Sequence, residues 1–127
     1  MKTLDDLNQK LKKIGAVEVT TDETLQLLSC AIDTPLSAVK DTIRNWNMVS
    51  FRDQKGELIS SHLVGYSENQ RTEWMTSIVV KTDLATGMIK TKNSYYLVKD
   101  PNTEAPGPEI VNHIFYTLNT WMSKWQV

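Results

Sequence analysis

The hydrophobic residues of this chain change their spacing near Asn47, and no other sequence feature constrains the fold as strongly. Before that residue they recur every three or four positions, which is the spacing of one helix face. After it they occur in short runs rich in Thr, Val, Ile and Tyr, separated by turn residues. A helical pattern returns only after the Pro-rich stretch 100–108. This order predicts an α+β fold: an N-terminal helical unit resembling a helix-turn-helix, an antiparallel sheet of about four strands, and a C-terminal helix packed on the sheet.

Four segments are expected to form helices. Thr3 is typical of the residue that precedes a helix, and Thr20-x-x-Glu23 has the capping-box pattern ahead of a second helix. Pro35 and Pro108 each suit the first turn of a further helix. The predicted helices cover residues 3–14, about 22–32, about 35–46, and the chain from 108 onward.

The other segments are expected to form strands. Residues 16–20 alternate and contain β-branched side chains, which favours a short strand. The turn signal 53–56 predicts one hairpin, and the three-residue connection 85–87 predicts a second. The predicted hairpin strands are 48–51, 58–66, 72–82 and 88–99.

The length of 127 residues fits a single domain, 1–127, in which 1–66 holds the helical unit and first hairpin and 67–127 the second hairpin and last helix. Its net charge of -1 provides no global attraction to nucleic acid or to an anionic membrane. Cys30 is the single cysteine, which excludes an intrachain disulfide and favours a reducing compartment. Without a signal-peptide pattern or a stretch that could span a membrane, we expect a cytoplasmic protein with no membrane partner.

The residues for catalysis or metal binding are poorly placed in the sequence. The two histidines, His62 and His113, have no His or Cys neighbour at a metal-ligand spacing. Ser61 and His62 are adjacent, and adjacent side chains of a strand point to opposite faces. The five glycines are scattered at turns, so no phosphate-binding loop is present. We expect a protein that is not an enzyme and uses no metal or cofactor.

Two helices, a short turn and a hairpin follow one another in the order of winged helix-turn-helix DNA-binding domains. In those domains the second helix lies in the major groove, where Arg and Lys contact guanine or phosphate and Asn pairs with adenine. The segment 35–66 has four cations against three anions, few for a DNA-binding surface, and a helical hairpin with a solvated polar face is the other interpretation. The residues predicted to contact DNA are Ser37, Lys40, Arg44 and Asn45 on the helix, and Arg52 and Lys55 on the wing.

The second hairpin and the last helix offer two candidate surfaces for a protein partner. Strict alternation along the return strand places Lys90, Lys92 and Tyr96 on one face, suited to the polar rim of an interface or to a single nucleic-acid strand. Trp121 and Trp125 belong to the aromatic stripe of the last helix, which would dock a partner or form a homodimer. The alternatives are an edge strand protected by its lysines and a helix stripe that covers the sheet.

The second hairpin also carries a longer residue pattern, which covers about 25 residues of the chain. The pattern is Trp74-x-Thr76-Ser77-x-Val79-Val80, then Gly87, then Thr91-x-Asn93-Ser94-x-Tyr96-x-Val98. It resembles a hairpin in small proteins of unknown function that are encoded by phages, prophages and other mobile elements. The resemblance implies a mobile-element origin and a bend in the strand at Asn93 and Ser94, and it brings no activity with it.

These observations favour a non-catalytic protein-binding module, in the role of an accessory or inhibitory protein of a mobile genetic element. The alternative is a winged helix-turn-helix transcriptional regulator. A third hypothesis is a small-molecule site between the sheet and the last helix, lined by Trp74 and Tyr95.

Overall fold

The computed structural model describes the backbone of residues 2–125 and the side chains of residues 2–121. It has the α+β fold that the sequence predicts, with the last helix packed on a sheet. Within the described part of the chain, no helix is both long enough and apolar enough to cross a membrane. The elements are α1 (Leu4–Leu11), β1 (Ala16–Val19), α2 (Asp22–Leu28), the 3-10 helix η1 (Leu36–Ala38), β2 (Val39–Arg52), β3 (Leu58–Ser67), β4 (Thr72–Asp83), β5 (Met88–Thr91), β6 (Tyr95–Lys99) and α3 (Pro108–Trp125).

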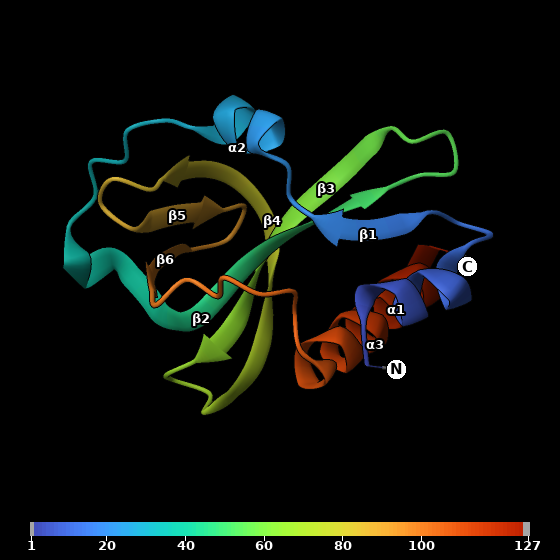
Figure 1. The fold of residues 1–127 in the computed structure, drawn as a ribbon. Coiled ribbons are helices and arrows are strands. Elements are labelled where there is room, and N and C mark those ends of the chain that lie inside the picture. The colour runs from blue at the N-terminus through green and yellow to red at the C-terminus, as the bar shows by residue number, and fades with distance from the viewer. Residues whose placement is uncertain (1, 126–127) are drawn as a thin grey trace.

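The strands form a closed meander with one added strand (Figure 1). Each strand from β2 to β6 pairs antiparallel with the next, and β6 then pairs with the first part of β2. Because five strands alternate in direction, the first and last run the same way, and this closing pair is parallel. Strand β1 pairs with the end of β2 and extends the sheet beyond the barrel. The prediction of about four antiparallel strands is therefore wrong in count and in character: the described sheet has six strands and is mixed.

Strand β2 pairs with strands in two parts of the sheet because it bends at a bulge. The register with β3 shifts between Arg44 and Asn47, and Asn45 has a φ of 49°. Before the bulge β2 pairs with β6, and after it β2 pairs with β1. Gly65 of β3 lies against this bulge, where an added Cβ atom would be 2.7 Å from the carbonyl oxygen of Arg44. The bulge is the point at which the barrel opens into the extended sheet.

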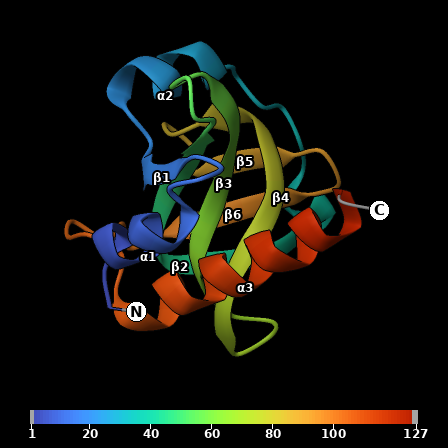
Figure 2. The ribbon, with the colours of Figure 1, turned by 90° about the vertical axis from the view of Figure 1, so that its right-hand side faces the viewer.

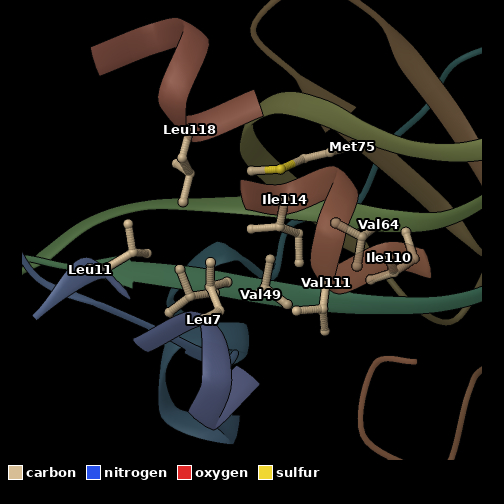
Figure 3. Close-up of a cluster of buried hydrophobic side chains, with 10 residues drawn as sticks. Leu7, Leu11, Val49, Val64, Met75, Ile110, Val111, Ile114 and Leu118 are labelled. Atoms are coloured by element: carbon tan, nitrogen blue, oxygen red, sulfur yellow. The ribbon is translucent and has the colours of Figure 1, made fainter. Parts of the chain in front are cut away.

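The described side chains form two hydrophobic clusters, one on each side of the sheet. Helices α1 and α3 cover one face (Figure 2) and bury the first cluster with it (Figure 3). The second cluster fills the barrel, and α2 packs against it through Leu25 and Leu28. The first cluster consists of Leu7, Leu11, Val17, Val49, Val64, Met75, Ile110, Val111, Ile114 and Leu118, and the second of Ile43, Met48, Leu63, Val79, Ile89, Tyr96 and Val98.

The first predicted helix start is confirmed, and the second is displaced by one residue. Thr3 and Asp6 form the capping box of α1. The Thr21 hydroxyl caps α2 instead of that of Thr20, whose hydroxyl lies 2.8 Å from Ser50 Oγ in the sheet. Helix α2 also ends earlier than predicted, because the Cys30 N–H donates to the Thr82 carbonyl of β4 and the chain is extended there.

The predicted third helix, about 35–46, is wrong. The chain makes a single 3-10 turn and then enters β2 at Val39. The apolar residues that suggested a helix also fit a strand, because Val39 and Ile43 lie an even number of residues apart. Asp41 lies between them and is buried, and its carboxylate accepts hydrogen bonds from the Ser67 hydroxyl and the Asn69 N–H. Pairing with β3 and β6 therefore overrides the local helical pattern.

The return strand of the second hairpin is broken in two. The chain bends at Lys92 and Asn93, one residue before the bend at Asn93 and Ser94 that the residue pattern implies. The Thr91 hydroxyl accepts hydrogen bonds from the N–H groups of Asn93 and Ser94. The bend separates β5 from β6 and reverses the alternation of side chains. Tyr96 is consequently buried opposite Ile89 inside the barrel, so the predicted common face of Lys90, Lys92 and Tyr96 does not exist.

Candidate functional site

Three side chains form a row across the outer face of β4, β5 and β6. Lys81 of β4 is paired with Lys90 of β5, and Lys90 is paired with Tyr95 of β6. The Lys90 ammonium lies 4.6 Å from the centre of the Tyr95 ring, a cation–π contact. Side chains of directly paired residues project from the same face of a sheet, so the two ammonium groups and the ring share one surface.

A bulge in β4 creates this row. Val79 is paired with Thr91 and Lys81 with Lys90, so β4 has one residue, Val80, more than β5 between these pairs. Bulges of this kind redirect side chains and recur beside functional sites. Without the extra residue, Lys81 would be on the opposite face from its present one. The bulge also leaves the Val80 side chain 39% exposed beside the lysines.

The segment after α2 turns this surface into a cleft, which we call the lysine cleft. Residues 31–34 belong to the segment that leaves α2 (Figure 1). They line the cleft together with the row, and its volume is about 270 Å³. The segment is held to the end of β4, because the Ile32 N–H donates to Asp83 Oδ2 at 3.1 Å. The lining residues are Ala31, Ile32, Asp33, Thr34, Val80, Lys81, Lys90 and Tyr95.

The two lysines of the cleft are unpaired cations. Like charges placed directly opposite each other across two strands destabilise a sheet. Among the described residues, the ion pairs all involve Arg44 or Arg52, so neither Lys81 nor Lys90 is in an ion pair. The cleft therefore combines the exposed Lys81 and the partly buried Lys90 with an apolar side chain and an aromatic ring. Such a surface complements an anionic group that carries an apolar neighbour.

Comparisons with protein-family models, with curated proteins and with solved structures found no match to this chain. The function is therefore inferred from the chemistry of the chain's own residues. The lysine cleft is the candidate site, since its charge is unpaired and its residues come from three strands and a loop that converge on it.

We expect Lys81→Gln to stabilise the protein slightly, although it removes a cleft residue. The change relieves the repulsion with Lys90 and keeps a polar side chain that is one atom shorter, which predicts a gain of about 0.3 kcal/mol in the free energy of unfolding. Urea denaturation of both proteins at low and at high salt measures it. The gain should shrink at high salt, which screens the two ammonium groups. A loss of stability at low salt would mean that Lys81 has a stabilising partner and is not a free cation.

The residues predicted for protein binding are dispersed. Lys90 lies in the cleft, and Lys92 is exposed on the neighbouring bend. Trp121 is partly buried against the first cluster, and its ring lies 5.1 Å from that of His62. The Trp125 side chain lies outside the described residues. The described part of the α3 stripe covers the sheet, which is the alternative that the sequence left open.

The residues predicted for DNA binding do not form a recognition helix. Ser37 lies in η1, Lys40, Arg44 and Asn45 lie in β2, and Lys55 lies in the turn after it. The guanidinium of Arg44 is paired with Glu68 and Asp100, and that of Arg52 with Glu18 at 2.6 Å. DNA contacts by these arginines would require breaking those ion pairs. DNA binding stays a prediction, but the helix-in-groove geometry on which it was based is wrong.

A second hollow lies between the start of β4 and the first half of α3, with a volume of about 530 Å³. Burial and, next, the nearby Glu109 carboxylate raise the pKa of Glu73. Burial also lowers the pKa of His113, whose ring lies 6.3 Å from that of Trp74. Both pKa shifts favour the uncharged forms of Glu73 and His113 in this hollow. The lysine cleft, in contrast, contains two cations that are in no ion pair with a described residue. Among the described residues, Tyr95 lines the lysine cleft and Trp74 packs against the second cluster, so the structure does not bring them together in the predicted small-molecule site.

Sequence reasoning missed Lys81 and placed Tyr95 in a different site. Simple alternation puts Lys81 on the same face as Met75 and Val79, but bulges in β4 separate all three: Met75 lies in the first cluster and Val79 in the second. The bulges follow from pairing with β3 and β5 and leave no mark in the β4 sequence. The lysines at 81, 90 and 92 were the available sequence signal for a positively charged site. Which of them lie opposite each other depends on the register of the two strands, which the sequence does not give.

Proposed function

We propose that this chain is a non-catalytic protein-binding module and that it holds a segment of its partner in the lysine cleft. The observation that carries the proposal is the unpaired Lys81 and Lys90 pair, which is unfavourable for the folded protein alone and becomes favourable when an anionic partner is bound. The resemblance of residues 74–98, which contain both lysines, supports an accessory or inhibitory role in a mobile genetic element.

The dimensions of the cleft support a segment of a protein rather than a large folded surface. A volume of about 270 Å³ accommodates a few side chains. Val80, Ile32 and the Tyr95 ring supply apolar contact area, and Lys81 and Lys90 line the same cleft. Protein interfaces combine apolar and polar contacts in this way.

Selection from a displayed library of random peptides tests the proposal. The immobilised full-length protein should enrich a family of related peptides, and these should lose binding to the double variant Lys81→Glu, Lys90→Glu. The matched control is Lys10→Glu, Lys12→Glu, which makes the same charge change at the C-terminal end of α1, far from the cleft (Figure 1). Circular dichroism confirms that both variants fold.

The outcomes separate the cleft from other surfaces. Loss of peptide binding in the cleft variant alone supports the proposal. Equal loss in both variants would mean that net charge, and not the cleft, attracts the peptides. Enrichment of no peptide family, or of peptides that bind both variants as well as the unchanged protein, would refute a protein-binding role for the cleft.

A further inference from the structure

We infer that the lysine cleft recognises one carboxylate side chain next to one apolar side chain in an acidic segment of the partner. This inference rests on the proposed function and specifies the chemistry of the partner. Two ammonium groups, of Lys81 and Lys90, and one carboxylate, of Asp33, line the cleft and give it a net charge of +1. A single carboxylate therefore neutralises the cleft, whereas a phosphate dianion would leave an excess negative charge beside Asp33.

The position of the lysines favours a carboxylate that is held from both sides. Because Lys81 and Lys90 are directly paired, both ammonium groups can donate to a single carboxylate placed between them. The bound carboxylate also removes their mutual repulsion, so its binding is stronger than that of a neutral amide of the same shape. Charge on the ligand is thus expected to matter more than its size.

The apolar part of the partner is positioned by the bulge. Val80 is 39% exposed although it lies in a strand of a closed barrel, and Ile32 and Ala31 face it across the cleft. An apolar side chain next to the carboxylate would cover Val80 and remove it from water. An acidic residue beside a Leu or Phe is therefore the expected core of the bound segment.

Two other modes of recognition fit the cleft less well. The partner cannot extend the sheet at Thr82 of β4, because Ser29 and Cys30 already pair with that residue. A nucleic-acid base would have to displace the Lys90 ammonium from the Tyr95 ring in order to stack on it. Of the three modes of recognition, contact with the side chains of a protein segment fits the cleft best.

The test compares labelled pools that differ only in charge, measured by fluorescence polarisation with the full-length protein. The acidic pool contains peptides built from Glu, Asp, Leu, Phe, Ser and Gly, and the amide pool has Gln and Asn in place of Glu and Asp. A phosphoserine pool and an oligothymidylate serve as further probes. We expect the acidic pool to bind about tenfold more tightly than the amide pool, and this preference to disappear in Lys81→Gln, Lys90→Gln.

Asp33→Asn provides a variant whose expected effect is a gain. It raises the charge of the cleft to +2, so the acidic pool should bind a few-fold more tightly and the phosphoserine pool should gain more than the acidic pool. Misfolding cannot produce such a gain. Unchanged binding of both pools would mean that Asp33 does not contribute to the site and would overturn the charge balance on which the inference depends.

The failures of the two proposals are distinguishable. Equal binding of the acidic and amide pools, with both dependent on the lysines, would overturn the carboxylate inference and leave the protein-binding role intact. Preference for the phosphoserine pool would do the same. Lysine-dependent binding of oligothymidylate alone would overturn both and indicate a nucleic-acid ligand. Binding of no probe, together with an unsuccessful peptide selection, would also overturn both.

Discussion

Gly65→Ala is expected to destabilise the protein by about 3 kcal/mol. An added methyl group would lie 2.7 Å from the Arg44 carbonyl oxygen and 2.7 Å from Ile43 Cγ2. Neither atom can move easily, because Arg44 is part of the sheet and Ile43 is fully buried in the barrel. The free energy of unfolding, measured by urea denaturation with circular dichroism, gives the size of the effect.

The effect should be large because Gly65 lies at the pivot of the sheet. Relief of the contact would require Gly65 to separate from the β2 bulge, where the barrel closes on one side and the extended sheet begins on the other. Close approach of two backbones is a recognised reason for a glycine inside a strand. Gly107→Ala is the matched control, since a Cβ atom at that position meets nothing within 4 Å. Equal urea midpoints for the two variants would contradict the described contact between β2 and β3.

Local sequence signals were sufficient for the elements whose stabilising contacts are themselves local. The capping box of α1 joins residues three positions apart, and the turn of the first hairpin is closed by Asp53, whose carboxylate accepts from the N–H groups of Lys55 and Glu57. The stripe of α3 has a plain helical period and packs as a helix stripe should. These parts of the fold could be predicted.

The first part of β2 could not be predicted because its stabilising contacts are distant in sequence. Asp41 occupies an inward position of the strand, where a charged residue argues against burial. Its partners, Ser67 and Asn69, lie more than twenty residues further along the chain. A local pattern cannot reveal that such a carboxylate is satisfied, and without that knowledge the helical spacing of Leu36, Val39 and Ile43 is the stronger signal.

The candidate site was predicted only in part for a similar reason. Lys90 was predicted as a surface cation, because its charge and its place in a predicted strand are enough for that prediction. The cleft also requires the β4 bulge at Val80 and the bend after Thr91, which together decide which side chains face the same way. The β4 bulge depends on pairing with another strand, so alternation within a single strand assigned the faces wrongly.

Stability is expected to fall as the pH is lowered from about 6.5, and His62 is the main cause. Its ring is 1% exposed, with Nδ1 3.0 Å from the Thr76 carbonyl oxygen and Nε2 2.8 Å from Ser60 Oγ. Because a carbonyl oxygen only accepts, Nδ1 carries the proton of the neutral ring and Nε2 accepts from the Ser60 hydroxyl. The neutral ring is thus fully hydrogen-bonded, and burial lowers the pKa of His62 below its ordinary value of 6.5.

The sign of the pH dependence follows from this lowered pKa. Between pH 6.5 and the lower pKa of the folded protein, the unfolded chain takes up a proton at His62 and the folded protein does not. The free energy of unfolding therefore falls by up to about 1.4 kcal/mol per pH unit in that interval. The lowered pKa values of Asp6 and Asp83 act in the same direction only at lower pH, because they begin from 3.8. The raised pKa of Glu73 acts in the opposite direction.

Urea denaturation between about pH 5 and pH 8 of the unchanged protein and of His62→Gln isolates the histidine, since the carboxylate contributions are common to both. Glutamine keeps a donor and an acceptor at this position and cannot take up a proton, so the slope between pH 5 and 6.5 should be nearly lost. His113→Gln is the control: burial lowers that pKa too, but the ring is only half-buried, so most of the slope should persist. If His62→Gln keeps the full slope and His113→Gln removes it, His113 is the buried titrating group. Because the Trp121 ring lies against His62, the same protonation should also weaken the packing of α3 on the sheet, away from the lysine cleft.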